Sequence, residues 1–168
     1  MSNVSNVSKE RHLDATDARI LRALNHEPRA TVLALAQRLG LSRNTVQARM
    51  TRLEREGVLR PFECRIDPAA LGYPLTAFVT AEVEQRRLTE VGVALTRITE
   101  VTEIIGLSGD MDLLIRVIAS DAEDLYRVAG HILACPGVLR TRTSLAMREL
   151  LPLRLTQVLD VLADDGRH

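Results

Sequence analysis

Residues 42–55 combine amide and guanidinium side chains at a spacing that would suit contact with a nucleic acid. Amides can bond adenine through two hydrogen bonds, and arginine suits phosphate oxygens, whose contacts give affinity rather than sequence information. Val46, Met50 and Leu53 recur at intervals of four and three residues, which predicts the buried side of a helix. The residues expected to contact DNA lie on or beside the other side: Ser42, Arg43, Asn44, Gln47, Ala48, Thr51, Arg52 and Arg55.

The side chains in this set divide by their chemistry. Asn44 and Gln47 carry the amides that can bond adenine, and Ala48 is small enough for close approach or contact with a thymine methyl group. Three arginines would contact phosphates: Arg43, Arg52 and Arg55. The alternative is a solvated basic helix without a partner, which a run of charge by itself would favour.

Capping residues and apolar spacing predict three helices around this face. The expected N-caps are Asp14, Thr31 and Ser42. Asp17 would also favour the start of the first helix, and Gly40 follows the second helix where a positive φ is wanted. The segment 58–66 looks like two short strands around a proline. Three helices, a very short turn before the third and a β-hairpin describe a winged helix-turn-helix, whose third helix enters the major groove.

The rest of the chain predicts a second domain. Alternating apolar residues indicate strands, and helical spacing lies between them, in the order β-α-β-β-α-β. This order is ferredoxin-like, so the expected fold class is α+β. The expected divisions are a mobile tail at 1–12, a winged helix-turn-helix domain at 13–66, a linker at 67–75, a ferredoxin-like domain at 76–152, and a C-terminal helix and tail at 153–168.

Charge is unevenly distributed between these two parts. The 168 residues include 22 Lys and Arg against 22 Asp and Glu. Residues 1–67 hold 12 basic and 8 acidic residues, a net of +4, and residues 68–168 hold 10 and 14, a net of −4. A neutral total therefore does not argue against DNA, because the positive charge accompanies the basic helix. Aromatic residues make up only 2%, which disfavours proteins that stack single-stranded bases on aromatic rings.

The sequence offers no sign of catalysis, of a metal site or of a membrane segment. Cys64 and Cys135 stand alone and far apart, as reduced thiols of a cytosolic protein do. No histidine has a second ligand at metal-binding spacing, and no nucleophile elbow or phosphate-binding glycine loop occurs. No apolar run reaches the roughly 18 residues that span a bilayer, and the start lacks the apolar region of a signal peptide. We expect a protein with no enzymatic activity, no metal and no cofactor.

Four segments resemble the Lrp/AsnC family of leucine- and asparagine-responsive regulators. They read LDATDARIL at 13–21, LSRNTVQARM at 41–50, LEREGVL at 53–59 and GDMDLL at 109–114. Each segment is moderately specific, and their order and spacing together make the resemblance strong. It covers about residues 13–150 and implies a DNA-binding transcription regulator.

The resemblance also implies what the second domain does. Such proteins pair through it as dimers, which often join into tetramers or octamers, and it senses a small molecule, usually an amino acid. The effector would bind near the turn Ser108, Gly109, Asp110, Met111 and Asp112. The glycine permits close backbone approach, the two aspartates could receive an α-ammonium group, and exposed N–H groups an α-carboxylate. From the residues alone a plain hairpin turn is the alternative, and the methionine stands where the family often has an aromatic residue.

Two other functions fit the same pattern of domains. Sirohaem decarboxylase subunits resemble this family in both domains, and a ligand-binding assembly protein would carry a degenerate DNA domain. The intact basic face of the third helix favours DNA over both. We therefore predict a cytoplasmic, nucleoid-associated regulator whose partners are double-stranded DNA, an amino-acid effector and further copies of the chain.

Overall fold

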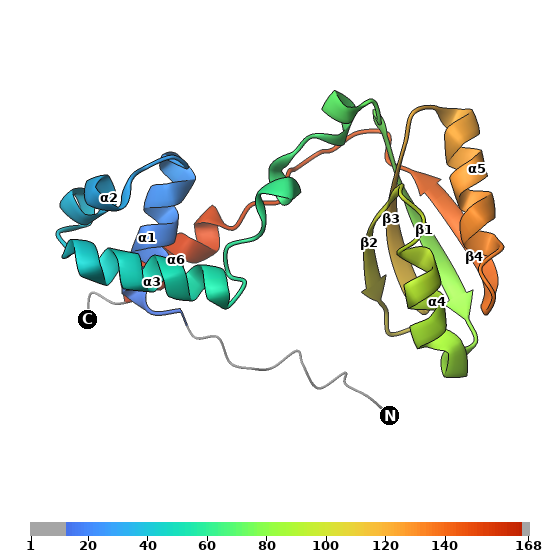
Figure 1. Ribbon diagram of the computed structural model, residues 1–168, viewed down its shortest axis with the longest axis horizontal. Helices are drawn as coiled ribbons and strands as arrows, with labels where there is room; N and C mark the ends of the chain where they lie inside the picture. Colours follow the sequence, from blue (N-terminus) through green and yellow to red (C-terminus); the bar gives the residue numbers. More distant parts are fainter. Residues whose placement is uncertain (1–12, 166–168) are drawn as a thin grey trace. The chain divides into compact units, whose positions relative to one another are not determined.

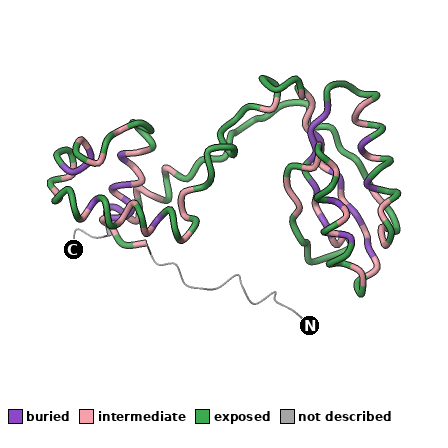
Figure 2. The backbone as a smooth tube through the Cα atoms, in the orientation of Figure 1, coloured by how far each residue is buried: buried purple, intermediate pink, exposed green. Residues whose placement is uncertain are grey.

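The computed structural model describes residues 13–165, which form two compact units. One unit contains the described residues up to Pro61 together with those from Leu151 onward, and the other runs from Phe62 to Leu150 (Figure 1). Buried positions lie on the helices of the first unit, and on the strands and helices of the second (Figure 2). The tail predicted at 1–12 lies outside the described residues.

The first unit is built on three helices: α1 (Ala15–His26), α2 (Val32–Leu39) and α3 (Arg43–Arg55). Each begins after an N-cap whose side chain accepts a hydrogen bond from a backbone N–H three residues on, and the caps are Asp14, Thr31 and Ser42. Gly40, at φ 65°, ends α2 in the left-handed region. The helices enclose a small apolar core of Ala23, Leu35, Ala36 and Val46. The three predicted helices and their caps are confirmed.

The segment 58–66 contains no strand, so the two short strands predicted there are wrong. Phe62–Arg65 forms a 3-10 helix instead. The backbone N–H of Val58 bonds back to the carbonyl oxygen of Leu53 (2.9 Å), which continues the end of α3 rather than starting a ladder. Pro61 has no N–H to give to a partner strand. The local hydrogen bonds therefore replace the expected hairpin.

A further helix, α6 (Thr156–Asp165), packs against α1 in the first unit (Figure 1). Arg22 donates a hydrogen bond to Asp160 (3.4 Å), and Asn25 donates one to Thr156 (3.2 Å). The helix predicted from residue 153 therefore begins three residues later. Helix α6 therefore belongs with the helices of the first unit, although the second unit precedes it in sequence.

The second unit is a four-stranded antiparallel sheet in the order β2-β3-β1-β4. Its strands are β1 (Leu75–Val83), β2 (Val101–Gly106), β3 (Leu113–Ala119) and β4 (Val138–Leu145). Helices α4 (Leu88–Leu95) and α5 (Ala122–Leu133) pack on one face, where they bury the inward residues of β1 and β3. The predicted ferredoxin-like β-α-β-β-α-β order is confirmed, and with it the α+β fold class.

Besides Phe62–Arg65, two short 3-10 helices lie in the second unit, one before β1 and one after it. Pro68–Leu71 lies inside the predicted linker and begins after Asp67, whose side chain accepts a hydrogen bond from a backbone N–H. Gln85–Arg87 joins β1 to α4. The connections are therefore locally ordered rather than extended.

Candidate DNA-binding interface

Helix α3 is capped at its N-terminus and anchored in the core along one side, and this anchoring determines which side chains it exposes. The backbone N–H of Thr45 donates to Ser42 Oγ (3.0 Å), and this cap starts the helix directly after the turn at Gly40. Val46 and Leu53 are fully buried, so one side of the helix is anchored in the core. The opposite side must then face outward.

Seven of the eight residues predicted to contact DNA are exposed: Ser42, Arg43, Asn44, Gln47, Ala48, Thr51 and Arg55. Among them, the side-chain amide of Gln47 lies 3.4 Å from the hydroxyl of Thr51, which orients it along the face. Arg55 has a side chain that is 74% exposed. We call these seven residues the α3 face. It presents amide, hydroxyl and guanidinium groups without a bulky apolar side chain.

Arg52 differs from the expectation, because its guanidinium has a partner inside the protein. It binds the carboxylate of Asp17, a residue of α1 that is fully buried. The side chain of Arg52 is only 36% exposed, and its Nε is buried with no hydrogen-bond partner. The hydrogen bond that Arg52 donates to Asp17, helped by the negative charge of Asp17, raises the pKa of Arg52 above its ordinary value. We therefore leave Arg52 out of the α3 face.

Asp17 is part of a group that joins α1 to α3, the α1–α3 charge cluster: Asp14, Asp17, Arg49 and Arg52. Arg49 Nη1 lies 2.6 Å from an oxygen of Asp14 and 2.8 Å from one of Asp17. Hydrogen bonds to both carboxylates raise the pKa of Arg49. The cluster holds two positive and two negative groups, so it is neutral as a unit.

The sequence predicted only that Asp14 and Asp17 favour the start of a helix, and it gave no role to Arg49. One signal could have revealed the cluster. Two carboxylates stand three residues apart at the start of one helix, and two guanidiniums stand three residues apart on another. Groups at that spacing share one side of a helix, so two helices packed side by side can pair them.

The predicted effector residues form the turn between β2 and β3. Ser108, Gly109 and Asp110 are exposed, and Gly109 has φ 138°, which favours glycine. The backbone N–H of Leu107 donates to the carbonyl oxygen of Asp112 (2.8 Å) and closes the turn. The structure thus brings the five predicted residues together at one end of the sheet.

Asp112 has a structural role that the sequence did not predict. Its carboxylate accepts a hydrogen bond from the backbone N–H of Val83 at the end of β1 (2.8 Å) and another from the side-chain amide of Gln85. Both carboxylate oxygens are therefore occupied. Asp110, which is exposed beside it, is the better placed of the two aspartates to receive an ammonium group.

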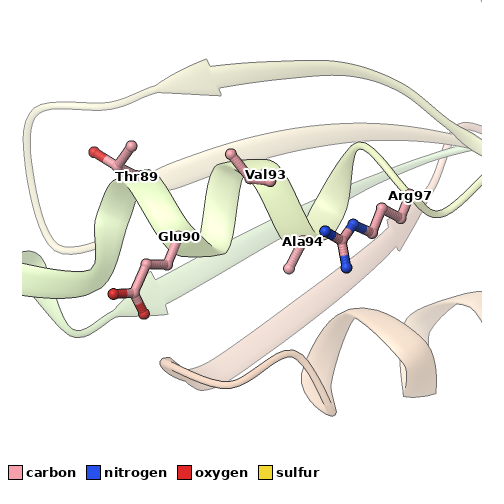
Figure 3. Close-up of a pocket in the computed structure, with 5 residues that line it drawn as sticks. All are labelled: Thr89, Glu90, Val93, Ala94 and Arg97. Carbon is pink, nitrogen blue, oxygen red and sulfur yellow. The ribbon is translucent and has the colours of Figure 1, made fainter.

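A shallow depression of about 310 Å³ lies elsewhere in the second unit, on the outer side of α4 (Figure 3). Its lining residues are Thr89, Glu90, Val93, Ala94 and Arg97. They come from one helix and the residues just after it, and Figure 3 shows their side chains spread along that helix. None of the five residues of the predicted effector turn takes part in it.

The described residues contain neither a metal-binding cluster nor a membrane-spanning helix. Between residues 13 and 165, no three His, Cys, Asp or Glu side chains gather in a way that would hold a metal ion. No helix in that range is both long enough and apolar enough to cross a membrane. Cys64 and Cys135 are free thiols, and burial raises the pKa of Cys135, which makes the reactive thiolate scarcer.

Comparison with known proteins covers both units. Residues 13–60 match the family described as winged helix-turn-helix DNA-binding, and residues 76–155 match the Lrp/AsnC ligand binding domain. A proline dehydrogenase transcriptional activator of Rhizobium radiobacter is 34% identical over 151 residues, which cover 88% of this chain and 97% of that protein. The transcriptional regulator AldR of Mycolicibacterium smegmatis is 34% identical over 146 residues, which cover 84% and 85% of the two chains.

A solved structure agrees with these relatives. The leucine response regulatory protein LrpA of Mycobacterium tuberculosis gives a TM-score of 0.71 at 31% identity, and the match covers 83% of this chain and 95% of that one. Matches of this identity extend over most of both chains and include both the helix-turn-helix and the sheet. The chain therefore belongs to the Lrp/AsnC family of DNA-binding transcription regulators.

Proposed function

We propose that this regulator recognises specific DNA sequences with the α3 face. The observation that carries the proposal is the exposure of seven polar or small residues on a helix whose other side is buried in the core. Asn44, Gln47 and Ala48 lie towards the N-terminal end, from which a recognition helix contacts base edges. Arg43 and Arg55 flank them and would bind phosphates.

The proposal predicts that Gln47→Ala changes sequence preference rather than general affinity for DNA. Sites bound in the genome are mapped first, and purified protein is then titrated with a mapped site and with random duplex at one stated salt concentration. Loss of a two-bond contact with adenine costs roughly 1–3 kcal/mol on the specific site and little on random DNA. The control is Arg55→Ala, which should lower the affinity for both duplexes by the same factor. Equal losses on both duplexes for Gln47→Ala would contradict the assignment.

We further propose that an amino acid binds at the turn 108–112. The matched domain is described as a ligand binding domain, and one relative is named as a proline dehydrogenase transcriptional activator. Asp110 supplies an exposed carboxylate for an α-ammonium group, and Gly109 leaves room for a ligand near the backbone. Calorimetric titration with the twenty amino acids tests this. Heat with one of them that Asp110→Asn abolishes supports the site, and no heat with any of them sinks it.

We propose that the protein works as a homodimer, with tetramers or octamers as further assemblies, and that it acts in the cytoplasm on the nucleoid. Pairing through the second unit is supported by its exposed apolar side chains, which include Ile105, Leu133 and Leu139. Light scattering measures the assembly directly. A mass of 18.6 kDa at micromolar concentration, that of a single chain, would contradict pairing.

The relatives described above are named as transcription regulators, which favours regulation over the decarboxylase-like activity. The two differ in a simple property of the purified protein. A tetrapyrrole-binding enzyme would take up the pigment and absorb in the Soret region, and the regulator would not. Addition of the tetrapyrrole, removal of the unbound pigment by gel filtration and absorption spectroscopy of the protein fraction separate them.

A further inference from the structure

Arg52 lies at the edge of the α3 face. A helix turns by about 100° per residue, so Arg52 lies roughly 40° round the helix from Ala48 and roughly 60° from Arg55. The neighbouring Arg55 is largely exposed and forms an ion pair with Glu56 (3.9 Å), whose side chain is 38% exposed, whereas the guanidinium of Arg52 is turned towards α1. The difference between two arginines one turn apart therefore comes from the buried carboxylate that Arg52 binds.

That partner is a carboxylate that has no access to water. Asp17 is fully buried, and its oxygens accept hydrogen bonds from Arg52, from Arg49 Nη1 (2.8 Å) and from the backbone N–H of Asp14 (3.1 Å). A buried charge depends on its partners, because no solvent replaces them. Transfer of Arg52 to a DNA phosphate would leave Asp17 with one cation instead of two. An exposed phosphate, screened by salt, is a weak competitor for this guanidinium.

We propose that Asp17 acts as an internal counterion that withholds Arg52 from DNA phosphates, and so sets the balance between specific and non-specific binding. The inference rests on the proposed role of the α3 face. Phosphate contacts strengthen binding to every sequence, so a withheld arginine lowers affinity for random DNA without removing a base contact. Asp17 is in this sense a specificity-determining residue that never touches DNA.

Substitution of Asp17 by asparagine provides the test. Asp17→Asn keeps the shape of the side chain and removes its charge, while Arg49 retains Asp14 and Arg52 can reach solvent. Affinity for random duplex is measured by fluorescence anisotropy at several potassium chloride concentrations. We expect the slope of log K against log salt to steepen by roughly 0.9, the value for one additional phosphate contact. We also expect the ratio of specific to random affinity to fall several-fold.

A double variant separates a withheld charge from a simple structural role. In Asp17→Asn/Arg52→Gln the slope returns to that of the wild type, because the released arginine is gone. A structural role alone would weaken binding in both variants and would steepen neither slope. An unchanged or shallower slope for Asp17→Asn, in protein with the circular dichroism of the wild type, overturns the proposal.

A second comparison decides the matter if Asp17→Asn does not fold. Arg52→Gln is compared with the matched variant Arg55→Gln, one turn further along the same helix. We expect Arg55→Gln to reduce the salt slope by roughly 0.9 and Arg52→Gln to leave it within error. Equal reductions overturn the proposal while leaving DNA binding by the wild type intact. If the wild type binds no duplex at low salt, the role of the α3 face fails as well, and the two failures are thus distinct.

Discussion

The carboxyl of Asp14 caps α1 and also bonds Arg49 of α3, so its ionisation links helix formation to helix packing. Partial burial opposes ionisation, but the hydrogen bonds from Arg49 and from the backbone N–H of Asp17 outweigh it and hold the pKa of Asp14 below its ordinary value of 3.8. Because the pKa of this carboxyl is lower in the folded protein, its ionisation stabilises the folded state at pH values above the ordinary pKa. That stabilisation is lost as the pH falls through the lowered pKa.

We predict that Asp14→Asn destabilises the protein at pH 7, and that its difference from the wild type shrinks below about pH 4. Asparagine remains a good N-cap, so the variant removes the charge and keeps the cap. Urea unfolding at a series of pH values measures the difference. Hydrogen bonds from Ser120 and Arg127 also lower the pKa of Asp124. Asp124 is present in both proteins, so its contribution to the pH dependence of stability drops out of the difference between them. A difference that stays constant from pH 7 to pH 3 would refute the assignment.

Asp112 and Asp110 are two residues apart but have different surroundings. Asp112→Ala leaves the backbone N–H of Val83 without its acceptor, in a partly buried position at the end of β1. We expect this to cost roughly 1–3 kcal/mol of unfolding free energy. Asp110→Ala, at an exposed position, should change it by less than about 0.5 kcal/mol. Urea denaturation of both variants measures this, and similar losses would show that Asp112 is not the structural residue of the pair.

At the scale of the element, two glycines of the second unit should respond in opposite directions to alanine. Gly137, just before β4, has φ 103°, and an added Cβ would lie 2.9 Å from a methyl carbon of Val91. We expect Gly137→Ala to destabilise by roughly 1–3 kcal/mol. Gly92 lies inside α4 with nothing within 4 Å of an added Cβ, so Gly92→Ala should stabilise by roughly 0.5–1 kcal/mol. Thermal unfolding of both variants decides this; a loss for Gly92→Ala equal to that for Gly137→Ala would contradict it.

The elements that the sequence predicted correctly are those defined by local chemistry. Asp14, Thr31 and Ser42 each cap a helix where predicted, because an N-cap bonds a backbone N–H only three residues away. The strands at 58–66 were not formed, because short segments become strands only if another segment pairs with them. Burial of one apolar face would favour such pairing, and here the end of α3 takes up the backbone hydrogen bonds.

The contacts that the sequence did not predict join residues far apart in the chain. Asp17 and Arg52 are separated by 35 positions. Helices α1 and α6 are in contact, although the whole second unit stands between them in the sequence. Helical periodicity identifies which side of α3 is buried but does not identify the partner of a charged residue at its border. The periodicity therefore predicted the exposure of seven of the eight residues expected to contact DNA, and the eighth, Arg52, has a distant counterion.

At the scale of the whole molecule, the charge distribution agrees with a division of labour between the units. The α1–α3 charge cluster is neutral, so it adds nothing to the positive charge of residues 1–67. Under the proposed function, exposed arginines such as Arg43 and Arg55 would supply the attraction to DNA. The negative second part of the chain would then serve the proposed pairing and effector binding.

A dimer with two α3 faces sets a geometric condition on the DNA. We predict a pseudo-palindromic site whose half-sites are separated by about one helical turn, roughly 10–10.5 base pairs, or a multiple of it. Insertion of about five base pairs between the half-sites turns one of them to the opposite side of the duplex, so only one recognition helix can bind. Affinity should then fall towards that of a single half-site, and insertion of about ten base pairs should restore part of it.

Titration of the three duplexes at one salt concentration measures this dependence. A duplex with both half-sites scrambled gives the non-specific affinity as the control. If the five-base-pair insertion binds as tightly as the natural spacing, the two half-sites are read independently. In that case the regulator engages DNA one recognition helix at a time, because a rigid pair of helices cannot follow a half-site through half a turn.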